Sequence, residues 1–225
     1  MNELPKRFYT AMKISLENIG RRFNREWIFS HVGYEFVTGG NYAILGANGS
    51  GKSTLLQIIA GSLTSSEGKI YYEHQGSKIN VEDIYQHISL AGPYLELIEE
   101  FTLSEIIDFH FSFKKYLPGT NSNLLIELLG FERARNKPVR NFSSGMKQRV
   151  KLALAMCSDT PILLLDEPTA NLDKQGIRWY TELIENYTSD RLVIVCSNQE
   201  HEYYFCDEHL HVMNFKDFSS VNKIG

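Results

Sequence analysis

The feature that most constrains this chain is a glycine-rich run at residues 46–53, Gly-Ala-Asn-Gly-Ser-Gly-Lys-Ser. It matches the pattern G-x-x-x-x-G-K-[ST] in full, in which glycines let successive backbone N–H groups turn inward around an anion. A short apolar strand at Tyr42–Leu45 runs into the loop, and a helix expected at Thr54–Ala60 follows it. This order of strand, loop and helix predicts a site for nucleotide phosphates on an α/β fold.

The polar side chains of this loop have separate expected roles. Lys52 reaches the β and γ phosphates, the Ser53 hydroxyl is a ligand for Mg²⁺, and the Thr54 hydroxyl touches the α phosphate. A glycine-rich turn that matches by chance is the alternative, and the flanking strand and helix argue against it. The nucleotide-binding residues expected here are Asn48, Gly49, Ser50, Gly51, Lys52, Ser53 and Thr54.

An acidic motif follows a second apolar strand. Ile162–Leu165 is an uninterrupted apolar run, typical of a parallel strand covered on both faces, and it ends in Asp166 and Glu167. Ligands of open α/β sheets bind at the carboxyl ends of the strands. Asp166 is therefore expected to hold Mg²⁺, directly or through water, and Glu167 to act as general base on an attacking water. A strand end capped by polar residues is the alternative, which the phosphate loop disfavours.

Composition excludes several classes of protein. The 225 residues are 43% hydrophobic, enough for a sizeable core, and the formal net charge of −4 argues against a nucleic-acid partner. No apolar run approaches the roughly 18 residues needed to cross a bilayer. Cys157, Cys196 and Cys206 are too few and too scattered for a disulfide framework or a metal knot. These features indicate a soluble protein of a reducing compartment.

The other segments alternate between strands and helices, which predicts an α/β sheet. Thr102 and Glu105 form a capping-box pattern for a helix through about Tyr116. A second helix is expected to close at Gly130. This second helix covers 124–129. The other expected elements are antiparallel strands at 12–16 and 32–36, short strands or a hairpin around Gly76 at 69–72 and 79–84, strands at 87–91 and 192–196, and a helix at 145–157.

These motifs, in this order, resemble the nucleotide-binding domain of ABC (ATP-binding cassette) ATPases over about residues 13–207. The run at 142–149, Phe-Ser-Ser-Gly-Met-Lys-Gln-Arg, resembles the LSGGQ signature. Residues 166–169 resemble the Walker B aspartate, the catalytic glutamate and the residues after them, and 170–173 resemble the D-loop. The resemblance implies an α/β fold: a P-loop NTPase core with a mostly parallel sheet, an N-terminal antiparallel β subdomain and an inserted α-helical subdomain.

The resemblance also implies a mechanism that needs two copies of such a domain. The pair closes head to tail on two ATP molecules, and each site combines one phosphate loop with the other subunit's signature. Ser143, Ser144 and the N–H of Gly145 would face a γ-phosphate in trans, with a plain helix N-cap as the alternative. Phe23 would lie against adenine, with Trp27 as a competing aromatic. Asp173 of the D-loop completes the expected nucleotide-binding set.

Several positions depart from the family pattern. Pro93 stands where the family has a glutamine near Mg²⁺, and Asn198 stands where it has a histidine that senses the γ-phosphate. Proline has no side-chain amide, and asparagine offers only a neutral hydrogen bond. Ser144 and Met146 replace a glycine and a glutamine of the signature. His201 is expected on a solvated helix face, with a reach inward to the phosphate as the alternative. Slow hydrolysis of Mg-ATP is therefore expected, with the catalytic residues Glu167, Lys52 and Asn198.

The function implied by the resemblance is the ATP-binding and ATP-hydrolysing subunit of an ABC transporter, cytoplasmic and peripheral on the inner face of the cell membrane. Its expected partners are a membrane-spanning subunit on a separate chain and a second ABC ATPase subunit, in a homodimer or a heterodimer. A non-transport switch that dimerises on ATP is the alternative, and the replacements at Pro93 and Asn198 favour it somewhat.

The chain is expected to form one domain over residues 1–225. Its core would comprise 1–93 and 143–225, and its helical subdomain about 94–142. Beside Pro93, four apolar side chains either line the contact with the membrane partner or pack the subdomain's own core. They are Tyr94, Leu95, Leu97 and Ile98.

Overall fold

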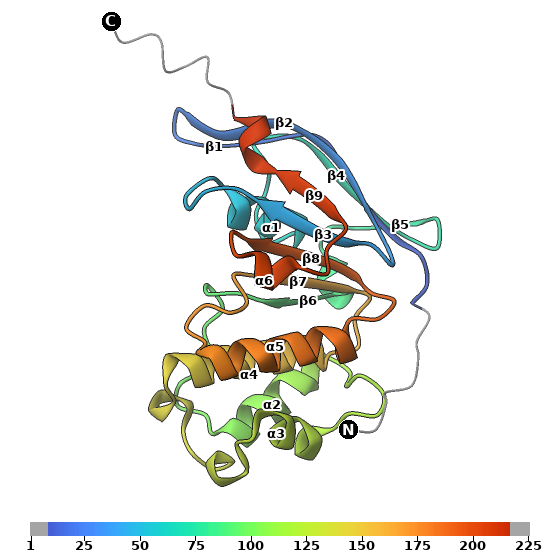
Figure 1. The fold of residues 1–225 in the computed structure, drawn as a ribbon. Helices are drawn as coiled ribbons and strands as arrows, with labels where there is room; N and C mark the ends of the chain where they lie inside the picture. Colours follow the sequence, from blue (N-terminus) through green and yellow to red (C-terminus); the bar gives the residue numbers. More distant parts are fainter. Residues whose placement is uncertain (1–8, 217–225) are drawn as a thin grey trace, which may run out of the picture.

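A computed structural model describes residues 9–216 and contains two β-sheets with helices around them (Figure 1). One sheet has the strand order β2-β1-β4-β5 and the other the order β6-β7-β8-β3-β9. The α/β fold expected from the sequence is therefore confirmed. The division into a core and a helical subdomain stays a prediction, and residues 1–8 and 217–225 lie outside the described part of the chain.

The four-stranded sheet is antiparallel, as expected. The hairpin around Gly76 is confirmed by the antiparallel pairing of β4 and β5, but the bounds 79–84 are wrong, because β5 already ends at Ile79 and a 3₁₀ turn begins at Ile84. The Asp83 N–H donates to the Asn80 carbonyl at 3.0 Å, so the chain turns directly after Ile79 and cannot continue the strand. The strands are β1 (Met12–Phe23), β2 (Glu26–Val37), β4 (Glu67–His74) and β5 (Ser77–Ile79).

The five-stranded sheet is parallel throughout. Its strands are β3 (Asn41–Leu45), β6 (Ile88–Ala91), β7 (Ile162–Asp166), β8 (Leu192–Ser197) and β9 (Glu208–His211). Every residue of β7 and β8 is buried, which confirms the prediction made from their apolar runs. Alternate side chains of β7 enter two cores, Leu163 and Leu165 on one face and Ile162 and Leu164 on the other.

Helices fill both faces of this sheet. Helix α1 (Lys52–Ile59) contributes to the core shared with the antiparallel sheet. On the opposite face lie α4 (Ser144–Met156) and α5 (Lys174–Tyr187), with α2 (Leu103–Phe113) and α3 (Ser122–Leu129) beyond them (Figure 1).

The capping box at the start of α2 is confirmed, since the Thr102 hydroxyl accepts from the Glu105 N–H and the Glu105 carboxylate accepts from the Thr102 N–H. The helix ends at Phe113, three residues before the predicted Tyr116. The reason is tertiary: the chain becomes extended at Lys114, and the Leu117 N–H donates to the carbonyl of Cys157 at 2.7 Å. Helix α3 closes at Gly130 with φ 68°, as predicted.

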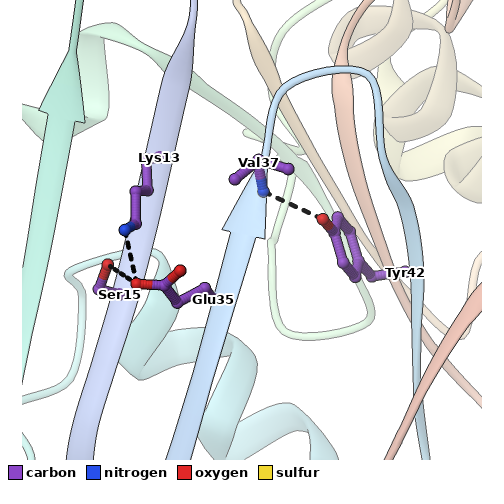
Figure 2. Close-up of polar contacts among 5 residues, drawn as sticks. All are labelled: Lys13, Ser15, Glu35, Val37 and Tyr42. Carbon is purple, nitrogen blue, oxygen red and sulfur yellow. Dashed lines mark hydrogen bonds and ion pairs between the residues drawn. The ribbon is translucent and has the colours of Figure 1, made fainter. Parts of the chain in front are cut away.

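The end of β2 is tied to β3 by a buried tyrosine (Figure 2). The Val37 N–H donates to the Tyr42 hydroxyl at 3.1 Å, and Tyr42 packs edge-on against Phe36. On the exposed face of the β1–β2 pair, Lys13 forms an ion pair with Glu35, which also accepts from Ser15. Because exposed ion pairs contribute little, the tyrosine contact is the one expected to matter for stability.

Replacing Tyr42 by phenylalanine is expected to lower the free energy of unfolding by about 1 kcal/mol, the net value of one hydrogen bond. The ring stays in place, so only the acceptor for the Val37 N–H is lost. Urea unfolding measures the change, with Tyr85→Phe as the control because that tyrosine is exposed. Equal midpoints for wild type and Tyr42→Phe would contradict the prediction.

A half-buried histidine makes the stability of the fold depend on pH. The His110 ring on α2 contacts the Ser158 hydroxyl at 2.8 Å, and burial lowers the pKa of His110 from 6.5 to about 4. Between these values the unfolded chain binds the proton and the folded chain does not. The contribution is therefore complete above pH 6.5 and is lost as the pH falls towards 4, by at most about 3 kcal/mol.

We expect urea unfolding at pH 7.5 and at pH 4.5 to show a smaller loss of stability for His110→Gln than for the wild type. Glutamine keeps a polar contact to Ser158 without a titrating group. Parallel pH profiles for the two proteins would show that His110 does not carry this dependence.

Candidate functional site

The glycine-rich loop joins β3 to α1 in a backbone conformation that requires glycine. Gly49 and Gly51 have φ values of 74° and 107°, in the left-handed region. A Cβ atom at Gly51 would also lie 2.4 Å from the Cγ2 atom of Ile28. Steric space and backbone angle therefore both explain the motif, and the predicted strand-loop-helix order is confirmed.

Lys52 is buried at the first turn of α1, with 4% of its surface exposed. Its ammonium group donates to the carbonyls of Gly46 at 2.8 Å and Ala47 at 3.3 Å. The Ser50 hydroxyl, also buried, has no hydrogen-bond partner within residues 9–216. A buried cation beside an unpaired hydroxyl donor suits an anion such as a phosphate group.

Asp166 ends β7 and is 3% exposed. Its Oδ1 atom is buried without a hydrogen-bond partner in the described part of the chain. Burial raises the pKa of Asp166 to about 6, against the opposing effect of a hydrogen bond from Ser53. A carboxylate oxygen without a partner beside a hydroxyl fits Mg²⁺, which is commonly held by one or two carboxylates together with substrate phosphates.

Glu167 turns the chain at the end of β7. Its φ of 42° is unusual for a residue with a side chain, and such strain is characteristic of functional sites. The Glu167 N–H still continues the ladder to β8 by donating to the Cys196 carbonyl at 2.9 Å. The residue is half-buried and directly follows Asp166, as the sequence predicted.

Asn198 lies directly after β8 and contacts the phosphate loop. Its Nδ2 atom donates to the Oδ1 atom of Asn48 at 2.7 Å. The position expected to sense a γ-phosphate is thus next to the loop expected to bind it. Its contact with phosphate itself stays a prediction.

The expectation for His201 is wrong. His201 is half-buried instead of lying on a solvated face, and its Nε2 atom is 3.0 Å from the Thr169 hydroxyl. Burial of the short helix α6 (Glu200–Tyr203) against the loop after β7 places it there.

The signature residues begin α4. Ser143 is the N-cap of this helix, and its hydroxyl oxygen accepts from the Met146 N–H at 3.2 Å. The capping role named as the alternative for this residue is therefore present. Ser143 and Ser144 are exposed. A Cβ atom at Gly145 would lie 2.8 Å from the Asn171 carbonyl oxygen, so glycine allows the D-loop backbone to approach the signature. The proposed contact of these residues with a nucleotide in trans stays a prediction.

Asp173 has a capping role that the sequence interpretation missed. It is the N-cap of α5, and its Oδ1 atom accepts from the Gly176 N–H at 2.7 Å. An aspartate directly before the first residue of a helix is a local signal that could have identified this cap.

The two aromatic candidates for adenine differ in exposure. Phe23 ends β1 with 52% of its surface exposed, and the Arg21 guanidinium lies 4.6 Å from the ring centroid. Trp27 is half-buried, and its ring packs against Gly20, where an added Cβ atom would lie 2.9 Å from the ring. Exposure favours Phe23 as the aromatic that is free to meet a base.

The segment after Pro93 is divided between surface and core. Tyr94, Leu95 and Ile98 are exposed, which excludes core packing for these three, whereas Leu97 packs against the buried cluster. The ammonium group of Lys151 donates to the backbone carbonyl of Gly92 at 3.4 Å. An apolar surface therefore lies directly beside Pro93, the residue that stands in place of the family's glutamine.

Two buried polar residues near the site were missed by the sequence analysis. Glu202 is fully buried and binds Thr169 and Ser197, and the Gln148 side chain on α4 donates to the Pro168 carbonyl at 2.9 Å. No local pattern distinguishes Glu202 from its exposed neighbour Glu200. Their partners are distant in sequence, so only the fold reveals them.

Comparisons with known proteins agree with this geometry. The sequence model of the family described as "ABC transporter" matches residues 29–170. The lantibiotic transport ATP-binding protein SrtF of Streptococcus pyogenes is 29% identical over 94% of this chain and 88% of its own length. The energy-coupling factor transporter ATP-binding protein EcfA1 of Thermotoga maritima is 32% identical over 85% of this chain and 74% of its own.

The fold matches solved cassettes as well. The structure titled "Dimeric Structure of MJ0796, a Bacterial ABC Transporter Cassette" superposes with a TM-score of 0.74 at 25% identity, covering 88% of this chain and 93% of that one. Within residues 9–216, no helix has the length and apolar character to cross a membrane. From the family match, the relatives and the arrangement of the site, this chain belongs to the ABC transporter family.

Proposed function

We propose that this chain binds Mg-ATP at the carboxyl ends of β3, β7 and β8 and hydrolyses it slowly. The observation that carries the proposal is the convergence of a buried lysine, an unpaired aspartate oxygen and a following glutamate beside one glycine-rich loop. These groups are Lys52, Asp166 and Glu167. Together they supply a cation for phosphate, an oxygen ligand for Mg²⁺ and a base for water.

Each residue has a distinct part in the proposed reaction. When ATP binds, the Lys52 ammonium group donates to phosphate oxygens instead of to the loop carbonyls. The backbone N–H groups of the loop donate to the other phosphate oxygens. Asp166 and Ser53 would hold Mg²⁺, which neutralises phosphate charge when bound. Glu167 accepts a proton from the attacking water. Asn198 offers its amide N–H beside the same loop, in place of the family's histidine.

As a family member the chain is the ATP-binding, ATP-hydrolysing subunit of a transporter, and such subunits work as pairs with a separate membrane component. The transport functions named for its relatives favour this role over a non-transport switch. We place the subunit at the inner face of the membrane. Exposed Tyr94, Leu95 and Ile98 are proposed to meet the membrane-spanning partner.

The test is steady-state phosphate release from Mg-ATP by the purified chain. We expect release above the background of a variant that lacks the base, yet slow, because neither Pro93 nor Asn198 supplies the family's side chain. Release that needs no Mg²⁺ would contradict the metal assignment. Turnover as fast as a robust family member without any partner would contradict slow hydrolysis.

Replacing Asn198 by histidine is expected to raise saturating turnover by about fivefold. A charge-assisted hydrogen bond to phosphate is about twice as strong as a neutral one, a gain of the order of 1 kcal/mol. The matched control is Asn198→Ala, which also removes the bond to Asn48 and should lower turnover. Equal rates for the histidine and alanine variants would show that this position does not contact the phosphate.

A further inference from the structure

Glu202 is a fully buried carboxylate in the short helix α6. Its Oε1 atom accepts from the Thr169 N–H at 2.7 Å and from the Thr169 hydroxyl, and its Oε2 atom accepts from the Ser197 hydroxyl. An ionised carboxylate is an acceptor only, so three converging donors match its chemistry. Burying such a charge is costly unless hydrogen bonds satisfy it, as they do here.

The two partners of Glu202 belong to the two segments that carry the active-site residues. Thr169 lies two residues after Glu167, in a turn where the Ala170 N–H donates to the Glu167 carbonyl at 3.0 Å. Ser197 directly precedes Asn198, whose amide contacts the phosphate loop. The Glu202 side chain therefore joins the segment that carries Glu167 to the segment that carries Asn198.

Neighbouring contacts keep this carboxylate in place. The buried Tyr180 hydroxyl donates to the backbone carbonyl of Glu202 at 2.7 Å, which holds α6 against α5. From the other side, Gln148 of the signature helix donates to the carbonyl of Pro168, beside Thr169. The loop after Glu167 is thus held between the signature helix and Glu202.

We propose that Glu202 is a positioning residue of the ATPase, which sets Glu167 relative to Asn198 by holding Thr169 and Ser197 with one carboxylate. This inference rests on the proposed function, in which Glu167 is the base. Displacement of a catalytic group by about 1 Å can cost a factor of about 100 in rate, so a residue that touches no substrate can still control kcat.

The first test replaces Glu202 by glutamine and by alanine. Glutamine keeps the size but turns an amide donor towards the Ser197 hydroxyl, which already accepts from the Gln199 N–H at 2.8 Å. We expect kcat for phosphate release to fall about tenfold in Glu202→Gln and about 100-fold in Glu202→Ala, with KM changed less than about threefold. The control is Glu200→Gln, an exposed acid on the same helix, which should leave both constants unchanged.

A second set of variants keeps the carboxylate and changes its partners, in case the Glu202 variants do not fold. Ser197→Ala and Thr169→Val each remove one hydroxyl donor and should lower kcat without raising KM. Thr169→Ser retains the hydroxyl and should restore the rate. A kcat within about twofold of wild type in Glu202→Gln would overturn the proposal, as would a rise in KM that accounts for the whole loss. If Glu202→Gln does not fold, a kcat within about twofold of wild type in both Ser197→Ala and Thr169→Val would overturn it instead.

The failure of this inference can be told apart from failure of the proposed function. Wild-type release no higher than that of Glu167→Gln contradicts the proposed function, and with it the role of Glu202. Wild-type release above that background, together with full activity in Glu202→Gln, overturns the positioning role alone.

Discussion

Replacing Glu167 by glutamine is expected to lower phosphate release from Mg-ATP by about 100- to 10,000-fold, the range that general base catalysis contributes. Glutamine has the size of the glutamate but cannot accept a proton from water. The residue is half-buried at the end of β7 in a strained backbone conformation, so a variant of equal size keeps the local structure. The measurement is steady-state phosphate release at saturating Mg-ATP.

Binding of ATP should survive the same change, because Glu167 is not among the residues proposed to hold the phosphates. A variant that binds ATP but does not hydrolyse it should also accumulate as the ATP-bound dimer. Size-exclusion chromatography in the presence of ATP would detect this dimer. Glu182→Gln, an acid on α5 away from the loop, is the matched control and should keep full activity. Residual turnover of Glu167→Gln close to the wild type would exclude Glu167 as the base.

Replacing Lys52 by alanine is expected to raise the dissociation constant for ATP by about 10- to 150-fold. A hydrogen bond that involves a charged group contributes about 1.5–3 kcal/mol, and the phosphate would lose this one. Removal of the ammonium group also frees the carbonyls of Gly46 and Ala47 that it binds. Titration with a fluorescent ATP analogue measures the change.

Two variants separate charge from packing at this buried site. Lys52→Met keeps most of the side-chain volume, so it should fold like the wild type and still bind ATP weakly. Lys69→Ala removes an exposed lysine of β4 and should leave binding unchanged. Wild-type affinity in Lys52→Met would show that the lysine does not contact the nucleotide.

The parts that could be predicted from the sequence are those encoded by neighbouring residues. Gly49, Gly51 and Lys52 carry their signal in a local pattern, because the loop needs left-handed backbone angles and a cation within a few residues. Strands β7 and β8 were recognisable because burial on both faces demands uninterrupted apolar runs. The end of β5 differs from the prediction because a local turn from Asn80 to Asp83 stops the strand. The end of α2 differs because the chain after it bonds to the distant carbonyl of Cys157.

The meeting of distant segments was decided by the tertiary structure. The amide pair of Asn198 and Asn48, the approach of Gly145 to Asn171 and the bonds that Glu202 accepts each join segments that no periodicity relates. Hydrophobic burial orders the strands as β6-β7-β8-β3-β9, and this order brings the loops together at one edge of the sheet. Local chemistry thus identifies the groups that bind ATP, whereas the packing of the sheet decides which of them touch.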